Sequence, residues 1–445
     1  MSSPNSGETP KRSNVRHTRA VQHDRTQRGG GAPVEEGIEQ VLRDVVHPAS
    51  WSQLGILRAS GMRSRVLTLP VMVGIVLTMI WRQVGSVCEM ARLINREVLL
   101  WIPKIKITQQ AINTRLRVMP ASVFGNVFDE ILPVMQERWR TRKRPLPAAI
   151  EWAQKRYEQV MICDGSVLES LIRKVGLLKD NETHPLAGRM TALLDASSRL
   201  PIWIGLTPEP MSSDQRFWPE ILERTHAGAL LIFDLGYTNY ARFGEMTQKG
   251  VTFITRAKDN LGYEVADVLE RSAAVHDQII WVGQTREGTR QQLRLVEVLY
   301  RGKWYRYLTN ELDPNRLPAE MLVNIYRERW GIESAFSIVK SLLGLSYFFC
   351  GAQNAVHLQV WATWILYAVL VDLTDAVADG LEKPFAAISM EMVYRSIQFY
   401  VTAHHRNETN DLVAFFVSEH KLLGLIKRKK PPKRVAETLT DGESP

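Results

Sequence analysis

The chain has 445 residues, 45% of them hydrophobic, which is enough apolar material for an ordinary globular protein of about two to four domains. Its formal net charge of +9 favours a polyanionic partner, because a basic surface releases counterions when it binds nucleic acid, although many basic proteins bind none. None of its three cysteines stands in a Cys-x-x-Cys pair, which excludes the common structural zinc sites and indicates a reducing compartment.

Both ends of the chain are basic and poor in large apolar residues. Residues 1–37 are rich in Ser, Gly, Arg and Thr, so we expect a disordered arm and no signal peptide. The C-terminal region, 406–445, contains a run of lysines and arginines from Lys427 to Arg434, which is either a DNA-contacting arm or a solvated tail. The longest apolar run, Val66 to Trp81, is shorter than the roughly 20 residues that span a bilayer, so we expect a buried helix and no membrane partner.

Residues 38–155 have the periodicity of helices, with apolar side chains three and four positions apart. One helix is predicted from Ser86 to Ile94, and a second begins after the capping residue Thr108 and ends at Pro120. The second helix carries Gln, Asn and Arg, as does a helix-turn-helix reader of the DNA major groove. A plain helical bundle is the equal alternative.

Residues 156–256 alternate between strands and helices. Apolar strands are predicted at Gln159–Cys163, Ala229–Phe233 and Val251–Thr255, with a hairpin from Met190 to Leu206. Helices are expected after Ser213 and between the last two strands. The resulting order of strand, strand, strand, helix, strand, helix, strand predicts an α/β fold with a ribonuclease-H-like mixed sheet.

A β-rich insertion is predicted at residues 257–312, with strands at Gln278–Gly283, Gln292–Tyr300 and Lys303–Thr309. Helices resume from about Pro318 to His405, so that residues 313–405 form the second part of the core. The insertion contains Trp281 and Trp304, which either pack in a core or hold an unstacked base. Three further aromatic residues are expected in the core because they lie at helical spacing: Trp361, Trp364 and Tyr367.

Two aspartates, Asp164 and Asp234, are predicted at the carboxyl ends of buried strands, each close to a glycine. Open sheets bind ligands at such ends. A single aspartate there is more often a turn or a helix cap, so these positions alone do not identify a catalytic site.

Four polar residues lie at offsets of 0, 3, 7 and 14 in one predicted helix: Tyr326, Arg329, Glu333 and Lys340. At about 100° per residue they fall within an arc of about 60°, beside an apolar face. That apolar face consists of Ile325, Ile332, Phe336, Val339 and Leu343. On geometry alone, a surface helix with an Arg329–Glu333 pair contributing about 0.3 to 0.5 kcal/mol is the simpler interpretation.

The spacing Tyr-x-x-Arg-x-x-x-Glu followed by Lys340 resembles the YREK signature of transposases of the insertion-sequence-four family. The segment from Asp234 to Tyr237 is similar to the family's second catalytic block, as are Phe243, Gly250, Phe253 and Arg256. Asp164-Gly165-Ser166 is similar to the first block. The resemblance extends from about Val160 to Leu345, in the family's order.

The resemblance implies a DDE transposase, a DNA nuclease and strand transferase that cuts and pastes an insertion sequence. Asp164, Asp234 and Glu333 would be the catalytic residues and the ligands of Mg²⁺ or Mn²⁺, in two sites. Two carboxylates about 4 Å apart repel by about 4 kcal/mol at an effective dielectric near 20, and a bound cation relieves that cost. The expected DNA-binding residues are Tyr326, Arg329, Lys340 and Arg256.

The family also implies double-stranded DNA partners, namely terminal inverted repeats and target DNA, and a homodimer on paired ends. It further implies that the helical region, residues 38–155, binds the DNA ends. We expect a cytoplasmic, nucleoid-associated protein of a bacterial-type cell. Two alternatives remain open at this point. One is a ribonuclease-H-like nuclease that hydrolyses DNA without joining it, and the other is a decayed transposase that only binds DNA.

Overall fold

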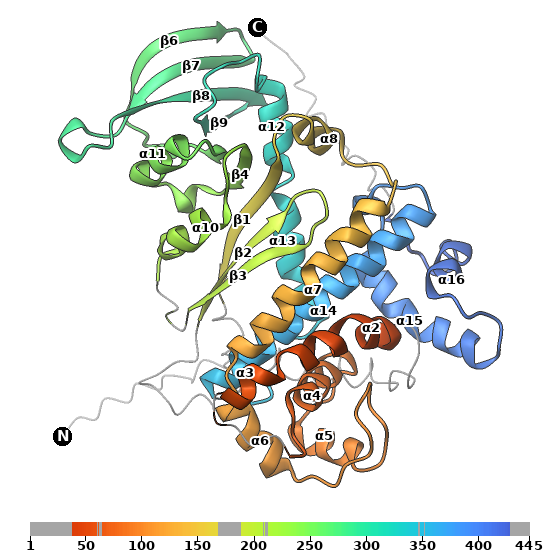
Figure 1. Cartoon of the computed structure of the whole chain (residues 1–445). Coiled ribbons are helices and arrows are strands. Elements are labelled where there is room, and N and C mark those ends of the chain that lie inside the picture. The colour runs from red at the N-terminus through yellow and green to blue at the C-terminus, as the bar shows by residue number, and fades with distance from the viewer. Residues whose placement is uncertain are drawn as a thin grey trace, which may run out of the picture.

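The computed structural model describes residues 38–427, apart from residues 60, 62–64, 168–187, 208, 210, 211, 346, 347 and 351. The predicted basic arm and most of the predicted basic tail lie outside the described residues. The described chain places one large mixed sheet beside a group of helices, as Figure 1 shows.

Nine strands form a single sheet in the order β3-β2-β1-β4-β5-β9-β8-β7-β6. The strands are β1 (Gln159–Val167), β2 (Arg189–Asp195), β3 (Pro201–Thr207), β4 (Ala229–Phe233), β5 (Thr252–Arg256), β6 (Glu264–Arg271), β7 (Val275–Val282), β8 (Gln291–Tyr300) and β9 (Lys303–Thr309). Strands β1, β4 and β5 are parallel, and the other pairs are antiparallel. The strand and helix order predicted for residues 156–256 is therefore present in the structure.

The β-rich segment extends this same sheet, because β9 pairs with β5 along Ile254–Arg256. Three of its four strands follow the sequence prediction. The fourth, β6, was not predicted. It is the edge strand, where even Val265 and Val268 are 52% and 51% exposed. Because neither face of the strand is buried, its sequence lacks the alternation of apolar and polar residues that predicts a strand.

Buried side chains cover both faces of the central strands. Because neighbouring residues of a strand point to opposite faces, Met161 and Cys163 of β1 pack in one cluster with α10 (Trp218–Arg224) and α11 (Tyr240–Gln248). Val160 and Ile162 pack in the other cluster, with helices from both ends of the chain. The central strands are thus enclosed, which explains their nearly continuous apolar sequences.

The N-terminal region is helical, as predicted. Its helices are α2 (Ile38–Ser52), α3 (Leu54–Ala59), α4 (Leu69–Trp81), α5 (Val87–Ile94), α6 (Gln109–Val118), α7 (Ser122–Thr141) and α8 (Ala148–Gln154). The cap predicted for α6 is present, because the Thr108 hydroxyl accepts a bond from Ala111 N. Ser86, predicted as the first residue of its helix, is the N-cap of α5 and accepts a bond from Glu89 N. Residues 95–108 separate the two helices, a longer connection than the turn of about three to four residues in a helix-turn-helix.

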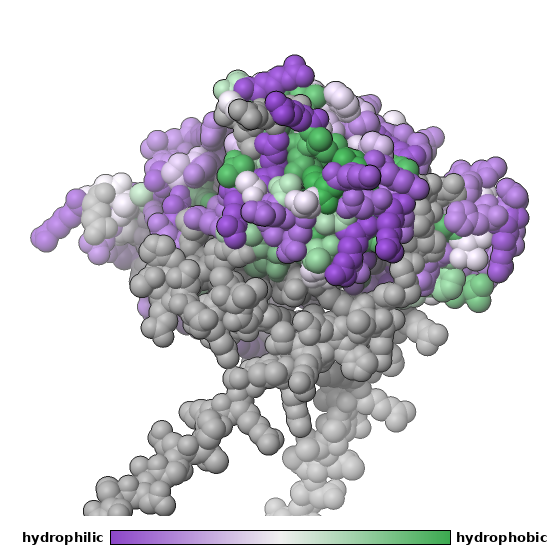
Figure 2. All heavy atoms as spheres, turned by 90° about the horizontal axis from the view of Figure 1, so that it is seen from below, coloured by the Kyte–Doolittle hydropathy of each residue, from purple (hydrophilic) through white to green (hydrophobic). Residues whose placement is uncertain are grey.

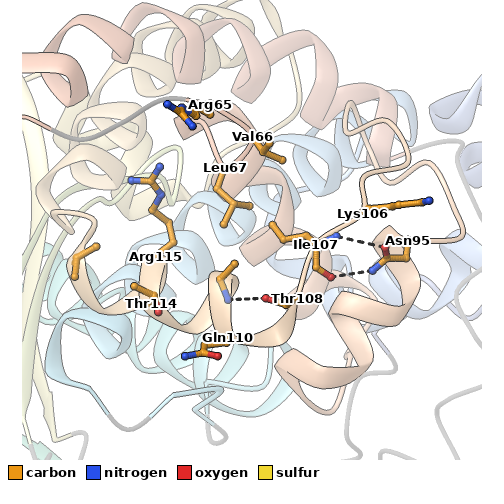
Figure 3. Close-up of a pocket in the computed structure, with 12 residues that line it drawn as sticks. Arg65, Val66, Leu67, Asn95, Lys106, Ile107, Thr108, Gln110, Thr114 and Arg115 are labelled. Carbon is orange, nitrogen blue, oxygen red and sulfur yellow. Dashed lines mark hydrogen bonds between the residues drawn. The ribbon is translucent and has the colours of Figure 1, made fainter.

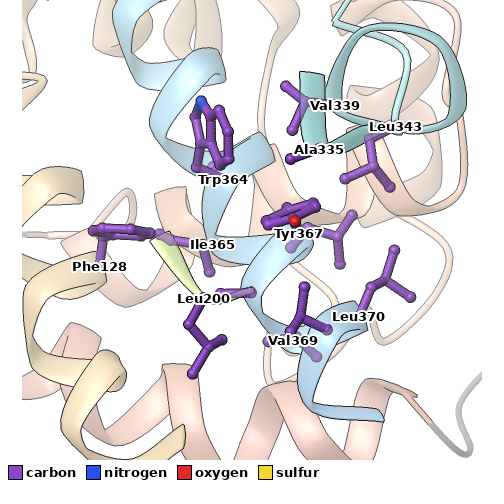
Figure 4. Close-up of a cluster of buried hydrophobic side chains, with 14 of the residues drawn as sticks. Phe128, Leu200, Ala335, Val339, Leu343, Trp364, Ile365, Tyr367, Val369 and Leu370 are labelled. Atoms are coloured by element: carbon purple, nitrogen blue, oxygen red, sulfur yellow. The ribbon is translucent and has the colours of Figure 1, made fainter. Parts of the chain in front are cut away.

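The C-terminal helices are α12 (Ala319–Arg327), α13 (Trp330–Ser337), α14 (Gln353–Gly380), α15 (Met390–His405) and α16 (Leu412–Ser418). By length and composition α14 is the one described helix that could cross a membrane, but 89% of its apolar window is buried inside the protein. It packs against α7, α4 and α16, and Trp364 and Tyr367 lie in the core, as predicted. Figure 4 shows these side chains facing Val339 and Leu343, which follow α13.

Candidate active site

Strand register places the two predicted aspartates side by side. In the parallel pair of β1 and β4 the last matched residues are Cys163 and Phe233, so Asp164 and Asp234 follow at the same edge. The predicted strand end at Cys163 holds only for this pair. On its other side β1 continues to Val167 and pairs with β2, with Asp164 opposite Ala192. Asp164 is therefore held within a strand, because β2 supplies hydrogen bonds that sequence periodicity does not reveal.

Arg329 connects the first aspartate to the glutamate. Its Nη1 donates to Asp164 Oδ2 at 2.8 Å, and its Nη2 donates to Glu333 Oε1 at 2.7 Å. The Arg329 residue is 7% exposed, so the structure differs from the surface helix that geometry alone favoured. The predicted Arg329–Glu333 pair is present, but Arg329 also donates to Asp164, which lies far from it in the sequence.

Tyr326 supplies the contact to the second aspartate. Its hydroxyl donates to Asp234 Oδ1 at 3.2 Å, and burial together with the Asp234 carboxylate raises the pKa of the phenol. The phenol is therefore protonated at neutral pH and acts as a donor. Tyr326 and Arg329 thus reach all three predicted catalytic carboxylates.

Lys340 reaches the same edge of the sheet. Its Nζ donates to Ser166 Oγ, two residues after Asp164 in β1, and burial lowers the pKa of the amine. Lys340 lies in a π-helix, Ile338–Leu342, that continues α13. Single π turns within helices are frequent at functional sites, since the extra residue per turn redirects a side chain.

The four signature residues do not lie on one continuous helix, which corrects the arc calculated from the sequence. Helix α12 ends at Arg327, α13 begins at Trp330, and the backbone between them has bonds from residue i to i−3, as from Arg329 N to Tyr326 O. Both residues between the helices keep helical dihedral angles and are held by tertiary contacts: Glu328 pairs with Arg199 at 2.6 Å, and Arg329 pairs with Asp164. Periodicity reports local spacing only, so it could not reveal this change in the hydrogen bonds of the helix. The five residues of the predicted apolar face are nevertheless buried.

The three carboxylates influence one another electrostatically. Burial raises the pKa of Asp164 to about 6, and the charges of Asp234 and Glu333 add to that rise, while Arg329 and the Gly165 N–H oppose it. A perturbed carboxyl group among like charges is typical of catalytic sites. The structure therefore brings together the three residues that the sequence separates by up to 169 positions.

Asp214 is a fourth carboxylate near this site that the sequence did not single out. It lies in the 3-10 turn Asp214–Phe217, its Oδ1 is 2.8 Å from Arg189 Nε, and burial raises its pKa. A methyl group added at Gly165 would overlap the Asp214 carboxylate. In the sequence this residue appears only as part of a helix start, and no local signal could have placed it against β1.

Arg256, the weakest of the predicted DNA-binding residues, ends β5 and is half-buried. Its guanidinium lies over the Tyr305 ring at 5.8 Å, and its charge lowers the pKa of Tyr326 slightly against the dominant effect of burial. Arg256 is thus close to the signature tyrosine. No direct bond from Arg256 to the three carboxylates is present in the described part of the chain.

The three carboxylates suit a hard divalent cation, although an arginine of the protein pairs with two of them in this structure. The three carboxylates offer only oxygen ligands, which Mg²⁺ and Mn²⁺ prefer. Within the described residues, no group of three His, Cys, Asp or Glu side chains is arranged to hold a metal ion. Arg329 instead neutralises Asp164 and Glu333. The donor chemistry therefore fits the expected ion.

The comparisons with known proteins agree with this chemistry. Residues 179–369 match the family model described as the transposase DDE domain. The matched segment contains Asp234 and the signature from Tyr326 to Lys340, and it begins after Asp164.

Two curated relatives carry the names of transposases. The protein y4zB of Sinorhizobium fredii (strain NBRC 101917 / NGR234) is 29% identical over 194 residues, which are 41% of this chain and 52% of that protein. The protein named for insertion sequence element IS5377 of Geobacillus stearothermophilus is 28% identical over 157 residues, 34% of this chain and 41% of that protein. The chain spans about half the length of the curated relatives it matches.

Among solved structures, the chain is similar to the cryo-EM structure of the piggyBac transposase synaptic complex with hairpin DNA. The identity is 10% and the TM-score is 0.40, over 87% of this chain and 84% of that chain. A TM-score this low does not establish a common fold.

Proposed function

We propose, from the match of residues 179–369 to the transposase DDE domain and the similarity to two proteins named as transposases, that this chain is a DNA transposase of the insertion-sequence-four family, YREK type, with a ribonuclease-H-like core. It binds the terminal inverted repeats of an insertion sequence, cleaves them and joins them to target DNA by cut and paste. The observation that carries this proposal is the pair of signature residues, Tyr326 and Arg329, in contact with Asp164, Asp234 and Glu333.

In this proposal Asp164, Asp234 and Glu333 hold Mg²⁺ or Mn²⁺. Two such ions, when bound, would activate the attacking oxygen and stabilise the leaving oxygen during displacement at phosphorus. Tyr326 orients Asp234 through its hydrogen bond. Arg329 and Lys340 lie where they can bind DNA phosphates, Arg329 with two parallel donors and Lys340 as a point charge. Arg256 is a weaker candidate for the same contact.

A second surface supports the binding of DNA ends. Helix α6 lines a groove of about 970 Å³ whose charged residues are all basic: Arg65, Lys106 and Arg115. Figure 3 shows Gln110 and Thr114 of α6 at this groove, opposite the segment of Arg65 and Leu67. Seen from below, this end of the molecule is mostly hydrophilic around a smaller apolar area (Figure 2).

The polar face of α6 offers the side chains that read bases. Gln109, Gln110 and Asn113 line its outer side together with Arg117, and amide side chains pair with adenine in the major groove. We propose that α6 contacts the terminal repeat while the basic residues of the groove bind its phosphates. The structure offers this surface without the short turn of a helix-turn-helix.

The proposed function is tested by replacing each carboxylate with alanine. Asp164→Ala, Asp234→Ala and Glu333→Ala should each abolish Mg²⁺-dependent nicking of element ends and leave the gel shift of those ends intact. Asn113→Ala should weaken the gel shift, because it removes a base contact, and should keep nicking when the protein is in excess. A carboxylate variant that nicks DNA at the rate of the unaltered protein would contradict the assignment of that residue.

Strand transfer distinguishes the proposal from its two alternatives. A transposase joins pre-cut ends to a target plasmid, whereas a nuclease of the same fold only hydrolyses DNA. A protein that only binds DNA would shift the ends and perform neither reaction. We expect joined products, action as a homodimer on paired ends, and a cytoplasmic location with the nucleoid.

A further inference from the structure

Donors of the protein itself already bind every carboxylate of the candidate active site. Arg329 binds Asp164 and Glu333, the Gly165 N–H donates to Asp164 Oδ1 at 2.8 Å, and Tyr326 binds Asp234. The guanidinium thus stands between two of the carboxylates that would hold a cation. A divalent cation bound by Asp164 and Glu333 would lie close to the positively charged guanidinium, so the cation and Arg329 compete electrostatically for these carboxylates.

The two carboxylates that bind Arg329 differ in exposure. The Asp164 side chain is 18% exposed and that of Glu333 is 40% exposed, whereas the Arg329 side chain between them is 8% exposed. The guanidinium carbon lies 5.4 Å from the centre of the Trp330 ring, and Trp330 is 61% exposed. Glu333 and Trp330 are thus the exposed neighbours of the guanidinium, and contact with an aromatic ring stabilises a cation.

The remaining nitrogen of the guanidinium also indicates incomplete pairing. Arg329 Nε is buried and has no hydrogen-bond partner among the described residues. A buried donor without a partner is costly, and a phosphate oxygen is a strong acceptor for such a group. The contacts among the described residues thus neutralise the charge of Arg329 but leave its Nε without an acceptor.

We propose that Arg329 is exchanged between the carboxylates and DNA, so that cation binding and phosphate binding are positively coupled. Without ligands, Arg329 neutralises Asp164 and Glu333. When a divalent cation takes its place there, the guanidinium is released to bind a phosphate of the DNA end. This inference rests on the proposed function, and it adds a regulation of the site: the cation is bound tightly only in the presence of DNA.

Thermodynamic linkage makes the coupling reciprocal. DNA that takes Arg329 away from the carboxylates must raise their affinity for the cation by the same factor by which the cation raises the affinity for DNA. Coupling between two sites is commonly about 5-fold to 150-fold. We expect at least a fivefold tighter binding of Mn²⁺ when a DNA end is present.

The experiment measures Mn²⁺ binding by electron paramagnetic resonance, without and with a blunt-ended duplex copied from the DNA that flanks the gene. Binding of Mn²⁺ to the duplex alone is measured and subtracted. Arg329→Gln should bind Mn²⁺ more tightly than the unaltered protein in the absence of DNA, because the competing cation is gone. The duplex should then raise its Mn²⁺ affinity by less than twofold.

The control is Arg306→Gln, which removes the same charge from a partly buried arginine that pairs with Glu297 and not with the three carboxylates. It should keep the Mn²⁺ affinity and the effect of DNA. Equal Mn²⁺ affinity of the unaltered protein with and without DNA would overturn the exchange, even if Arg329→Gln failed to fold. The proposed function fails by a different result, namely Mn²⁺ binding that Asp164→Ala leaves unchanged together with no cleavage.

Discussion

At the scale of single residues, the site depends on contacts between positions far apart in the sequence. Asp164, Asp234 and Glu333 could be selected beforehand because the resemblance to a family identified them, whereas each alone is an ordinary acidic residue. Asp214 could not be selected, since its position against Gly165 follows from the placement of the 3-10 turn Asp214–Phe217 beside β1. Sequence patterns report neighbours along the chain, whereas the contacts of Asp214 are with residues that are distant in the sequence, Gly165 and Arg189.

We expect stability and activity to require Gly165, because the absence of a side chain there leaves room for the Asp214 carboxylate. Gly165→Ala places a methyl group against the Asp214 carboxylate, so one of them must move, and overpacking of this kind costs about 1 to 3 kcal/mol. We expect a lower melting temperature and slower cleavage. The double variant with Asp214→Ala should recover part of the stability, and a simple sum of the two single effects would show that the residues do not interact.

At the scale of elements, the strands and caps were predictable and the irregular helices were not. Apolar runs identified β1, β4 and β5, and the capping residue Thr108 identified α6, because both signals are local. The 3-10 turn between α12 and α13 and the π turn at Lys340 are accompanied by ion pairs and bonds to β1 and to the loop before β3, which are not local. Edge strand β6 was missed because both of its faces are exposed, so its sequence has no alternation of apolar and polar residues.

The π turn directs Lys340 to the end of β1, and this predicts how Lys340 contributes to DNA binding. Lys340→Ala should weaken the binding of element ends and reduce the slope of log affinity against log salt by about one unit, because one counterion fewer is released. Mn²⁺ affinity should be unchanged. Binding measured by fluorescence anisotropy at several salt concentrations tests this. A slope equal to that of the unaltered protein would mean that Lys340 only stabilises β1 through Ser166.

At the scale of the whole molecule, the helical region and the second part of the core are joined by buried ion pairs between α7, the segment after it, and α14. Arg138 and Arg142 bind Asp372 at 3.0 and 2.6 Å, and Arg142 and Arg144 bind Asp375. The central helix α14 therefore carries carboxylates in an otherwise apolar sequence. Composition alone could not reveal these pairs, because their members lie about 230 positions apart.

These ion pairs predict that the two parts of the molecule unfold together. The Asp375 side chain is 1% exposed, so Asp375→Ala would leave the positive charges of Arg142 and Arg144 buried without their shared partner. Removal of one member of a buried pair costs about 3 to 5 kcal/mol, which is a large part of the stability of a domain. As a matched comparison, Glu391→Ala removes an exposed partner of Arg395 and should cost less than about 1 kcal/mol. Thermal melting followed by circular dichroism should show one lowered transition for Asp375→Ala and an unchanged one for Glu391→Ala. Two separate transitions in Asp375→Ala would mean that the helical region and the sheet fold independently of each other.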